Sequence, residues 1–172
     1  MRLSRASGGG RASLVLDAEE ATLIGDLAGQ LVAVLDAADA RDGGGDRASR
    51  RPVDPVLTRL LPDAYPSDAE ASREFRRFTA SELTSLKVEN ARRVMADVTR
   101  EPAEIPLDDL ALGSWLRVLT DIRLALAMRL GMDERGEIPH RARPSDEHEA
   151  VLDVYDWLGY LQESLVAAAT GE

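Results

Sequence analysis

The two histidines are the side chains of this sequence best suited to hold a metal or to transfer a proton at neutral pH. His140 lies in a predicted loop, and His148 lies in the first turn of a predicted helix. Helical bundles with a di-iron centre use two Glu-x-x-His pairs on facing helices, and these two positions do not fit that arrangement. We therefore expect no metal site. The acidic residues around His148 are typical of the first turn of a helix.

The glycines and serines supply no catalytic motif either, and the chain has no cysteine. Gly43-Gly44-Gly45 lacks the Lys-Ser/Thr ending of a phosphate-binding loop, so we interpret it as an ordinary loop. Gly113-Ser114-Trp115 lacks the second glycine of a nucleophile elbow. The absence of cysteine excludes disulfides, zinc–thiolate sites, iron–sulfur clusters and thiol catalysis. The sequence therefore predicts a protein that is not an enzyme and uses no cofactor.

The composition indicates a single soluble domain. Of the 172 residues, 44% are hydrophobic, which is enough for a packed core. Aromatic residues make up 4%, too few for a surface that stacks single-stranded bases, and the net charge of −10 disfavours binding to DNA phosphates. No apolar run approaches the roughly 18 residues of a membrane span, and the N-terminus lacks the apolar core of a secretory signal. We expect a cytoplasmic protein without membrane contact.

The first predicted helix covers about residues 17–40. It opens with Asp17 and Glu20, which form a capping-box pattern. The stripe expected to face the core is Leu23, Leu27, Leu31 and Val34, with Ile24 and Leu35 beside it. Before this helix we expect a flexible basic tail over about residues 1–13, and the apolar residues 14–16 leave open a short strand or hairpin.

The centre of the chain is predicted to form two helices separated by a bend, after a short helical segment that opens at Asp54. Ser67 with Glu70, and Thr79 with Glu82, form two further capping-box patterns. Two caps twelve residues apart predict a bend near the second cap. The core stripe expected after that bend is Leu83, Leu86, Val94 and Val98.

A further helix is predicted to start at Asp108 or its neighbour and to run to Gly131, which suits a left-handed C-cap. Pro102 and Pro106 are expected to stop the helix before it. Its core face is Leu112, Trp115, Leu119, Ile122, Leu126 and Leu130. Apolar residues on the opposite side, at positions 124 and 128, indicate that this helix has neighbours on two sides.

Ser145 caps the last predicted helix, and loops are expected near residues 41–53 and 132–145. The core stripe of this helix is Val151, Val154, Tyr155, Leu158, Leu161 and Leu165. Together these patterns predict an all-α fold. It is a single-domain helical bundle over residues 1–172, with four main helices plus short helices.

A helix-turn-helix would let such a chain read DNA directly. The candidate region is residues 68–98, where the two predicted caps separate basic helices, with a turn at residues 79–81. That turn has no glycine, and the helix after it carries Glu82 and Glu89. We therefore keep a direct DNA-binding regulator as an alternative function only.

Charge is distributed unevenly along the chain. Residues 17–40 contain six acidic residues and residues 144–172 contain seven, and neither segment has a Lys or Arg, whereas residues 73–93 lean basic. Two interpretations remain open. Either the basic segment packs against the acidic first and last helices, or the acidic faces stay open to a basic protein partner, whose association they would accelerate.

Three segments carry a resemblance that covers nearly the whole chain. The first is DPVLTRLLPDAY at residues 54–65, the second joins residues 115–116 with 121–126 and 130–131, and the third is YDWLGYLQE at residues 155–163. In order and spacing they resemble an actinobacterial family first catalogued as a domain of unknown function. Some of its members are described as oxidative-stress transcriptional regulators (AosR-like).

The resemblance implies a regulator that acts through protein contact. The implied partner is an RNA polymerase sigma factor of the extracytoplasmic-function class. Redox sensing in such regulators is ascribed to cysteines, and this chain has none, so direct thiol sensing is excluded.

The matching segments supply the candidate residues for partner binding or for a structural network. They are Arg59, Asp63, Tyr65, Asp121, Arg123, Tyr155, Trp157, Tyr160, Gln162 and Glu163. Arg117 and Asp121 are spaced to pair along one helix face. Arg123 is placed to clamp a carboxylate from another element, with Asp63, Asp156 and Glu163 as candidates. Trp157 and Tyr160 are either second-side core residues, aromatics at the edge of the core, or anchors for a partner or a dimer.

The sequence thus favours a non-enzymatic regulator of transcription and stress response that works through protein–protein contact. A sigma factor or RNA polymerase is the expected partner. The alternatives are the DNA-binding regulator and a structural or adaptor bundle, and a homodimer remains open.

Overall fold

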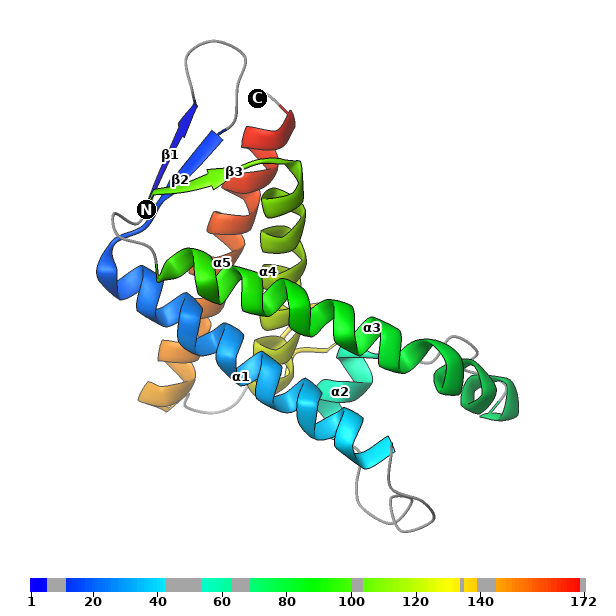
Figure 1. Ribbon diagram of the computed structural model, residues 1–172. Helices are drawn as coiled ribbons and strands as arrows, with labels where there is room; N and C mark the ends of the chain where they lie inside the picture. Colours follow the sequence, from blue (N-terminus) through cyan, green and yellow to red (C-terminus); the bar gives the residue numbers. More distant parts are fainter. Residues whose placement is uncertain are drawn as a thin grey trace.

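The computed structural model gives a mostly helical single domain with a small sheet at one end (Figure 1). It describes residues 1–5, 12–42, 54–62, 69–99, 104–133, 135–138 and 145–170. In chain order the elements are β1 (Arg2–Arg5), β2 (Ala12–Val15), α1 (Ala18–Asp42), α2 (Pro55–Leu60), α3 (Ala69–Val98), β3 (Glu104–Leu107), α4 (Asp109–Leu130) and α5 (Asp146–Thr170). The prediction of a single helical domain with four main helices is confirmed, and of the predicted short helices the described residues contain α2.

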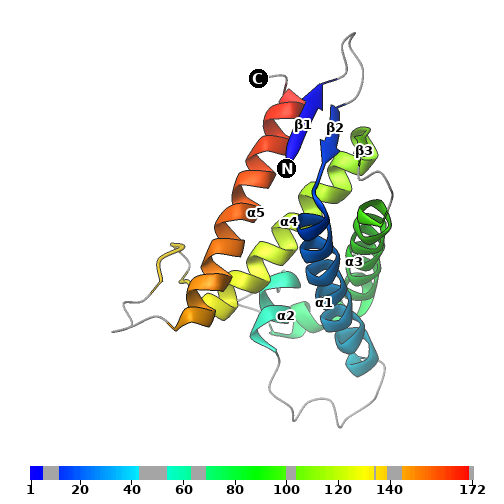
Figure 2. The ribbon, with the colours of Figure 1, turned by 90° about the vertical axis from the view of Figure 1, so that its left-hand side faces the viewer.

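Helix α4 is the centre of the fold and contacts every other helix as well as β3. Figure 2 shows α5 on one side of α4 and the pair α1 and α3 on the other. The neighbours expected on two sides of α4 are therefore present. Its core face is the predicted one, because Trp115, Leu119, Ile122, Leu126 and Leu130 are buried and Leu112 is half-buried.

The strands form an antiparallel sheet in the order β1-β2-β3. The hairpin left open by the sequence is therefore present, and residues 2–5 and 12–13 belong to strands, which corrects the prediction of a flexible tail there. Strand β3 was not predicted. Ile105 and Leu107 point into the core between exposed neighbours. Pro106 was assigned only a helix-stopping role, but it is tolerated in an edge strand, where its missing N–H breaks no ladder.

Helix α1 begins with the predicted capping box. The backbone N–H of Glu20 donates to Asp17 Oδ1 at 2.9 Å, and that of Asp17 donates to Glu20 Oε2 at 3.0 Å. The predicted core stripe is wrong in part, because the buried face is Ala21, Ile24, Ala28, Leu31 and Leu35. The prediction chose leucines as core residues over alanines. The alanines are buried instead, because small residues allow α1 to pack closely against α3. A Cβ at Gly25 would lie 3.4 Å from Val98 Cγ2.

Helix α3 is unbroken from Ala69 to Val98, so the predicted bend at Thr79 and the helix-turn-helix are both wrong. The Thr79/Glu82 pattern lies inside the helix, and the Ser67 cap lies outside the described residues. Its buried face includes Thr84, Val88, Ala91 and Val94. By contrast, Leu83 and Leu86 are 40% and 49% exposed, so their assignment to the core stripe is also wrong.

The other helix ends follow their predicted caps. Asp54 Oδ1 accepts from the N–H of Val56, and Asp108 Oδ1 accepts from the N–H of Ala111. Gly131 ends α4 with φ of 70°, the left-handed conformation that glycine adopts without strain. Ser145 Oγ accepts from the N–H of His148 at 3.2 Å.

One described helix is long and apolar enough to cross a membrane, judged by length and composition alone: Ala18–Ala38, within α1. The core helix of a soluble protein meets the same criterion. Here the inward face of α1 belongs to the hydrophobic core, and Asp26 and Asp36 lie on its exposed side.

Candidate functional site

Arg123 of α4 contacts Tyr155 and Gln162 of α5, and these contacts are called the bracket below. Its guanidinium carbon lies 4.6 Å from the centroid of the Tyr155 ring, a cation–π distance. Nη1 donates to Gln162 Oε1 at 2.9 Å, and Gln162 Nε2 in turn donates to Thr120 Oγ1 at 2.8 Å. Arg123, Tyr155 and Gln162 are three of the ten residues predicted for partner binding or a structural network, and the structure brings their side chains together.

Gly159 makes room for this bracket. A Cβ at that position would lie 3.3 Å from Arg123 Nη2, so the guanidinium crosses α5 where a side chain is missing. In the described part of the chain, Arg123 pairs with neither Asp156 nor Glu163, which corrects the carboxylate clamp for these two residues. Asp63 lies outside the described residues. The Arg123 Nε is buried without a hydrogen-bond partner, so the bracket carries an unsatisfied donor.

We expect Arg123→Ala to lower the free energy of unfolding by about 1–2 kcal/mol. The variant loses the cation–π contact with Tyr155 and the hydrogen bond to Gln162, while loss of the unsatisfied Nε offsets part of the cost. The matched control is Arg117→Ala, an exposed arginine on the same helix. Urea unfolding of both variants measures the difference, and equal midpoints would show that the bracket adds no stability.

A second polar contact joins α4 to α3. Asp121 is 4% exposed, and its Oδ1 lies 2.6 Å from Lys87 Nζ. Arg117, the partner predicted for Asp121, is exposed and forms no ion pair with this carboxylate, so that prediction is wrong. Burial raises the pKa of the Asp121 carboxyl above its usual value of 3.8, and the hydrogen bond and charge of Lys87 act to lower it.

The sequence analysis missed Lys87 as a site residue, although one signal could have found it. Lys87 is the single lysine among 21 basic residues. A compact ammonium on a flexible stem fits a narrow space between two helices better than a planar guanidinium does. The lone lysine therefore marks a position with specific packing demands.

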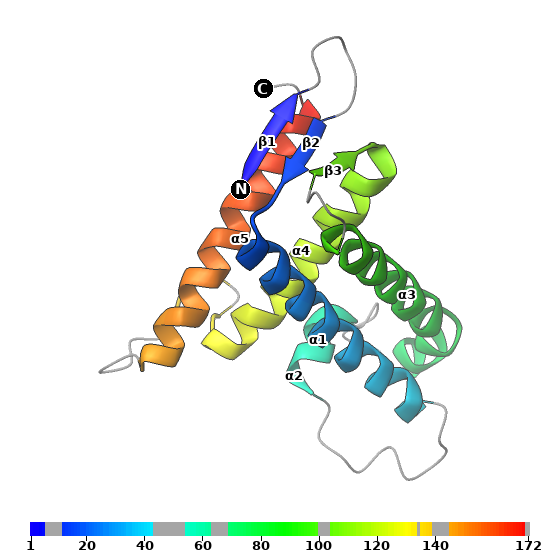
Figure 3. The same ribbon diagram turned by 60° about the vertical axis from the view of Figure 1, so that its left-hand side comes forward.

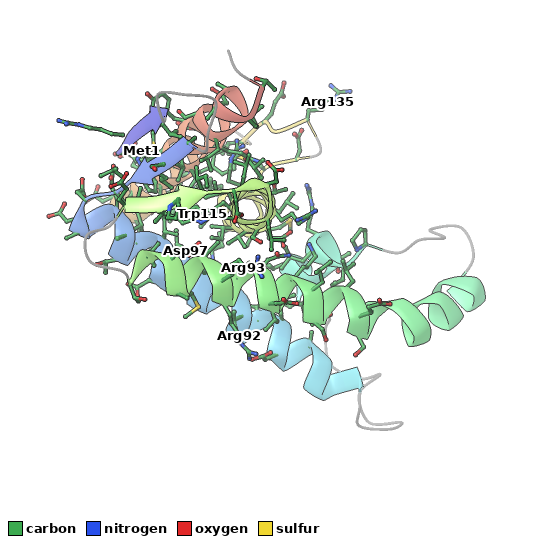
Figure 4. All side chains as sticks on the ribbon, turned by 45° about the horizontal axis from the view of Figure 1, so that its top comes forward. Met1, Arg92, Arg93, Asp97, Trp115 and Arg135 are labelled. Carbon is green, nitrogen blue, oxygen red and sulfur yellow. The ribbon has the colours of Figure 1, made fainter. Side chains whose placement is uncertain are left out.

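A third contact lies deeper in the core. Trp115 is fully buried, and its Nε1 donates to Asp97 Oδ2 at 3.1 Å (Figure 4). Asp97 is 6% exposed and comes from the last turns of α3. Trp115 was predicted as a core residue. Asp97 was missed because an acidic residue in a helix is normally expected to be exposed to solvent. The pair fixes the position of α3 along α4.

The remaining predicted site residues do not gather at one place. Arg59 is half-buried in α2, while Asp63 and Tyr65 lie outside the described residues. Trp157 is partly buried against the core. Tyr160 is 63% exposed, and Glu163 is exposed beside it on the outer side of α5. The structure therefore separates an internal α4–α5 network from an outward-facing surface.

The two interpretations of the acidic segments apply to different helices. Helix α1 packs against α3, which contains the segment 73–93 that leans basic, and Arg92 Nη2 lies 3.8 Å from Asp36 Oδ2 in an exposed pair. Helix α5 packs against α4 and β1. Within the ranges that the structure describes, no carboxylate of α5 forms an ion pair, and no group of three metal-binding side chains is present. Among the described residues, the acidic surface of α5 is therefore open.

These features define a mostly helical domain with a three-stranded sheet at one end, internal polar contacts between its helices and an acidic outer helix. The chain belongs to the family described as Domain of unknown function (DUF2017), whose model matches residues 1–169. The resemblance stated from the sequence is thereby confirmed. No solved structure matches the chain.

The curated relatives are named as regulators. The chain is 29% identical over 174 residues to proteins of Mycobacterium bovis and Mycobacterium tuberculosis named "Oxidative stress regulator AosR". These alignments cover 88% of this chain and 79% of the relatives. A relative from Mycobacterium leprae is 29% identical over 133 residues, which cover 70% of this chain and 60% of its own length. The names support a regulatory role for the family members.

Proposed function

We propose that this protein is a cytoplasmic regulator of transcription in the stress response that acts by binding another protein and catalyses no reaction. The observation that carries the proposal is the open acidic surface of α5, whose carboxylates are exposed and unpaired in the described part of the chain. The relatives named oxidative stress regulators support the regulatory part of the proposal. An acidic surface suits a basic protein partner and accelerates association with it.

The partner that fits is a sigma factor of the extracytoplasmic-function class, free or bound to RNA polymerase. A protein that binds promoter DNA needs a basic surface to neutralise phosphates, and such a surface is complementary in charge to α5. This partner is the one implied by the family resemblance.

Direct DNA binding has less support. Its candidate motif required a turn at residues 79–81, and α3 continues through these residues as one helix. The net charge of −10 also opposes binding to phosphates.

Binding to purified extracytoplasmic-function sigma factors and to the polymerase core tests this function. Surface plasmon resonance should detect a complex whose association rate constant falls steeply between low and physiological salt, because salt screens the charges that steer the two proteins together. If none of these proteins binds, or if the protein alone retards promoter DNA at physiological salt, the proposal is wrong.

A further inference from the structure

The outer side of α5 carries a straight row of exposed side chains. The row consists of Glu149, Asp153, Asp156, Tyr160 and Glu163, spaced alternately four and three residues apart. In an α-helix this spacing keeps side chains in line along one face, as in the contact seam of a coiled coil. Fourteen residues of helix span ~21 Å. The row is thus long enough to contact about four turns of a second helix.

Nothing in the described part of the chain covers this row. The opposite side of α5 carries Leu158, Leu161 and Leu165, all fully buried. Figures 2 and 3 show α5 at the outer edge of the fold, across α4 from α3. Arg123 reaches toward α5, but its guanidinium is held by Gln162 and Tyr155 beside the row.

Tyr160 lies within this acidic row and is its one apolar group. Its side chain is 63% exposed, the largest exposed fraction among the large hydrophobic residues of the described chain. Aromatic residues surrounded by polar groups are typical anchors of protein interfaces, and a tyrosine ring also attracts the guanidinium of a partner arginine.

We propose that this row, hereafter the α5 acidic row, is the docking face for a basic amphipathic helix of the partner protein, with Tyr160 as its anchor. The proposal rests on the proposed function and identifies the surface that performs it. A second copy of this chain does not fit, because two α5 acidic rows repel each other, and an anionic membrane is repelled for the same reason. A helix with arginines spaced three and four apart is complementary in both shape and charge.

A synthetic helical peptide serves as the probe. It has about 20 residues, which is long enough to form a helix, with arginines alternately three and four apart on one face and a leucine at its centre. A scrambled peptide of the same composition is the comparison. An NMR titration of the full protein should show that the helical peptide binds and that the amide chemical-shift changes are concentrated in α5. The scrambled peptide should bind at least about fivefold more weakly.

Three variants separate the row from the general negative charge. Asp153→Asn with Asp156→Asn should weaken peptide binding about fivefold, since each lost pair contributes a modest amount. Tyr160→Ala should weaken it about tenfold, and Tyr160→Phe should bind nearly as well as the original. The matched control, Asp26→Asn with Glu82→Gln, removes the same charge from exposed positions of α1 and α3 and should change binding less than about twofold.

The outcomes distinguish this inference from the proposed function. If the control pair weakens peptide binding as much as the α5 pair, or if the shifts spread over α1, the docking face is not the α5 acidic row. If a sigma factor binds the protein and the α5 variants bind it equally well, regulation by protein contact stands and this inference fails. If the peptide maps to α5 and no sigma factor binds, the docking face stands and the sigma-factor assignment fails.

Discussion

Replacing Trp115 by alanine should lower the free energy of unfolding by about 3–5 kcal/mol, close to the whole stability of a marginal domain. Trp115 is fully buried on the core face of α4, the helix on which every other helix packs. Its removal leaves a large cavity and takes a hydrogen-bond donor away from the buried carboxylate of Asp97. Urea unfolding followed by far-UV circular dichroism measures the loss, with tyrosine fluorescence as a second probe.

Two further variants divide this loss into its packing and hydrogen-bond parts. Trp115→Phe keeps most of the ring but removes the indole N–H, so it should cost about 2 kcal/mol, less than alanine does. Leu110→Ala on the same helix is the control, because that side chain is 62% exposed and should cost less than about 0.5 kcal/mol. A Trp115→Ala protein as stable as Leu110→Ala would contradict the central role of this residue.

The parts of the fold that sequence predicted well are those set by local chemistry. The capping box at Asp17, the cap at Asp108 and the left-handed Gly131 each depend on a few neighbouring residues. The core face of α4 was also predictable, because a helix buried on two sides selects large apolar residues at most inward positions.

The parts that were missed depend on contacts between distant segments. Strand β3 has only four residues and contains a proline, and it exists because β2 offers an edge to pair with. On α3, the leucines at 83 and 86 were assigned to the core by periodicity alone. The helix instead buries Thr84 and Ala91, because the positions of α1 and α4 decide which face is covered.

The candidate site residues show the same difference between local contacts and contacts between distant segments. Tyr155 and Gln162 lie seven residues apart on one face of α5, and Arg123 meets them because α4 packs against that face. Asp121 was predicted to pair within its own helix, but its partner is Lys87 of α3, 34 positions earlier in the chain. Sequence spacing can propose pairs within a helix, whereas pairs between helices require the packing itself.

The buried pair of Lys87 and Asp121 leads to the second large effect. Lys87→Met should lower the free energy of unfolding at neutral pH by about 3 kcal/mol, because it leaves the carboxylate of Asp121 buried without its countercharge. This is the lower end of the usual range, since the Lys87 side chain is 18% exposed and solvent screens part of the interaction. The control is Arg92→Met, on the same helix as Lys87, which breaks the exposed pair between Arg92 and Asp36 of α1.

The loss should depend on pH in a direction that follows from the carboxyl group. Burial raises the pKa of Asp121 above 3.8, and Lys87 opposes this rise, so the pKa rises further in the variant. A folded protein that holds a proton more tightly than its unfolded chain loses stability as the pH rises through the raised pKa. The stability difference between wild type and variant should therefore be largest near neutral pH and shrink as the pH falls from the raised pKa of the variant toward that of the wild type.

A double variant tests whether the Asp121 charge is the cause. Adding Asp121→Asn to Lys87→Met removes that charge, so it should recover about half of the lost stability and abolish the additional pH dependence. Unfolding in urea across this pH range measures both effects. If Lys87→Met were equally costly at every pH, the loss would come from the packing of the lysine stem. The ion pair would then position α3 against α4 without contributing to the stability that depends on charge.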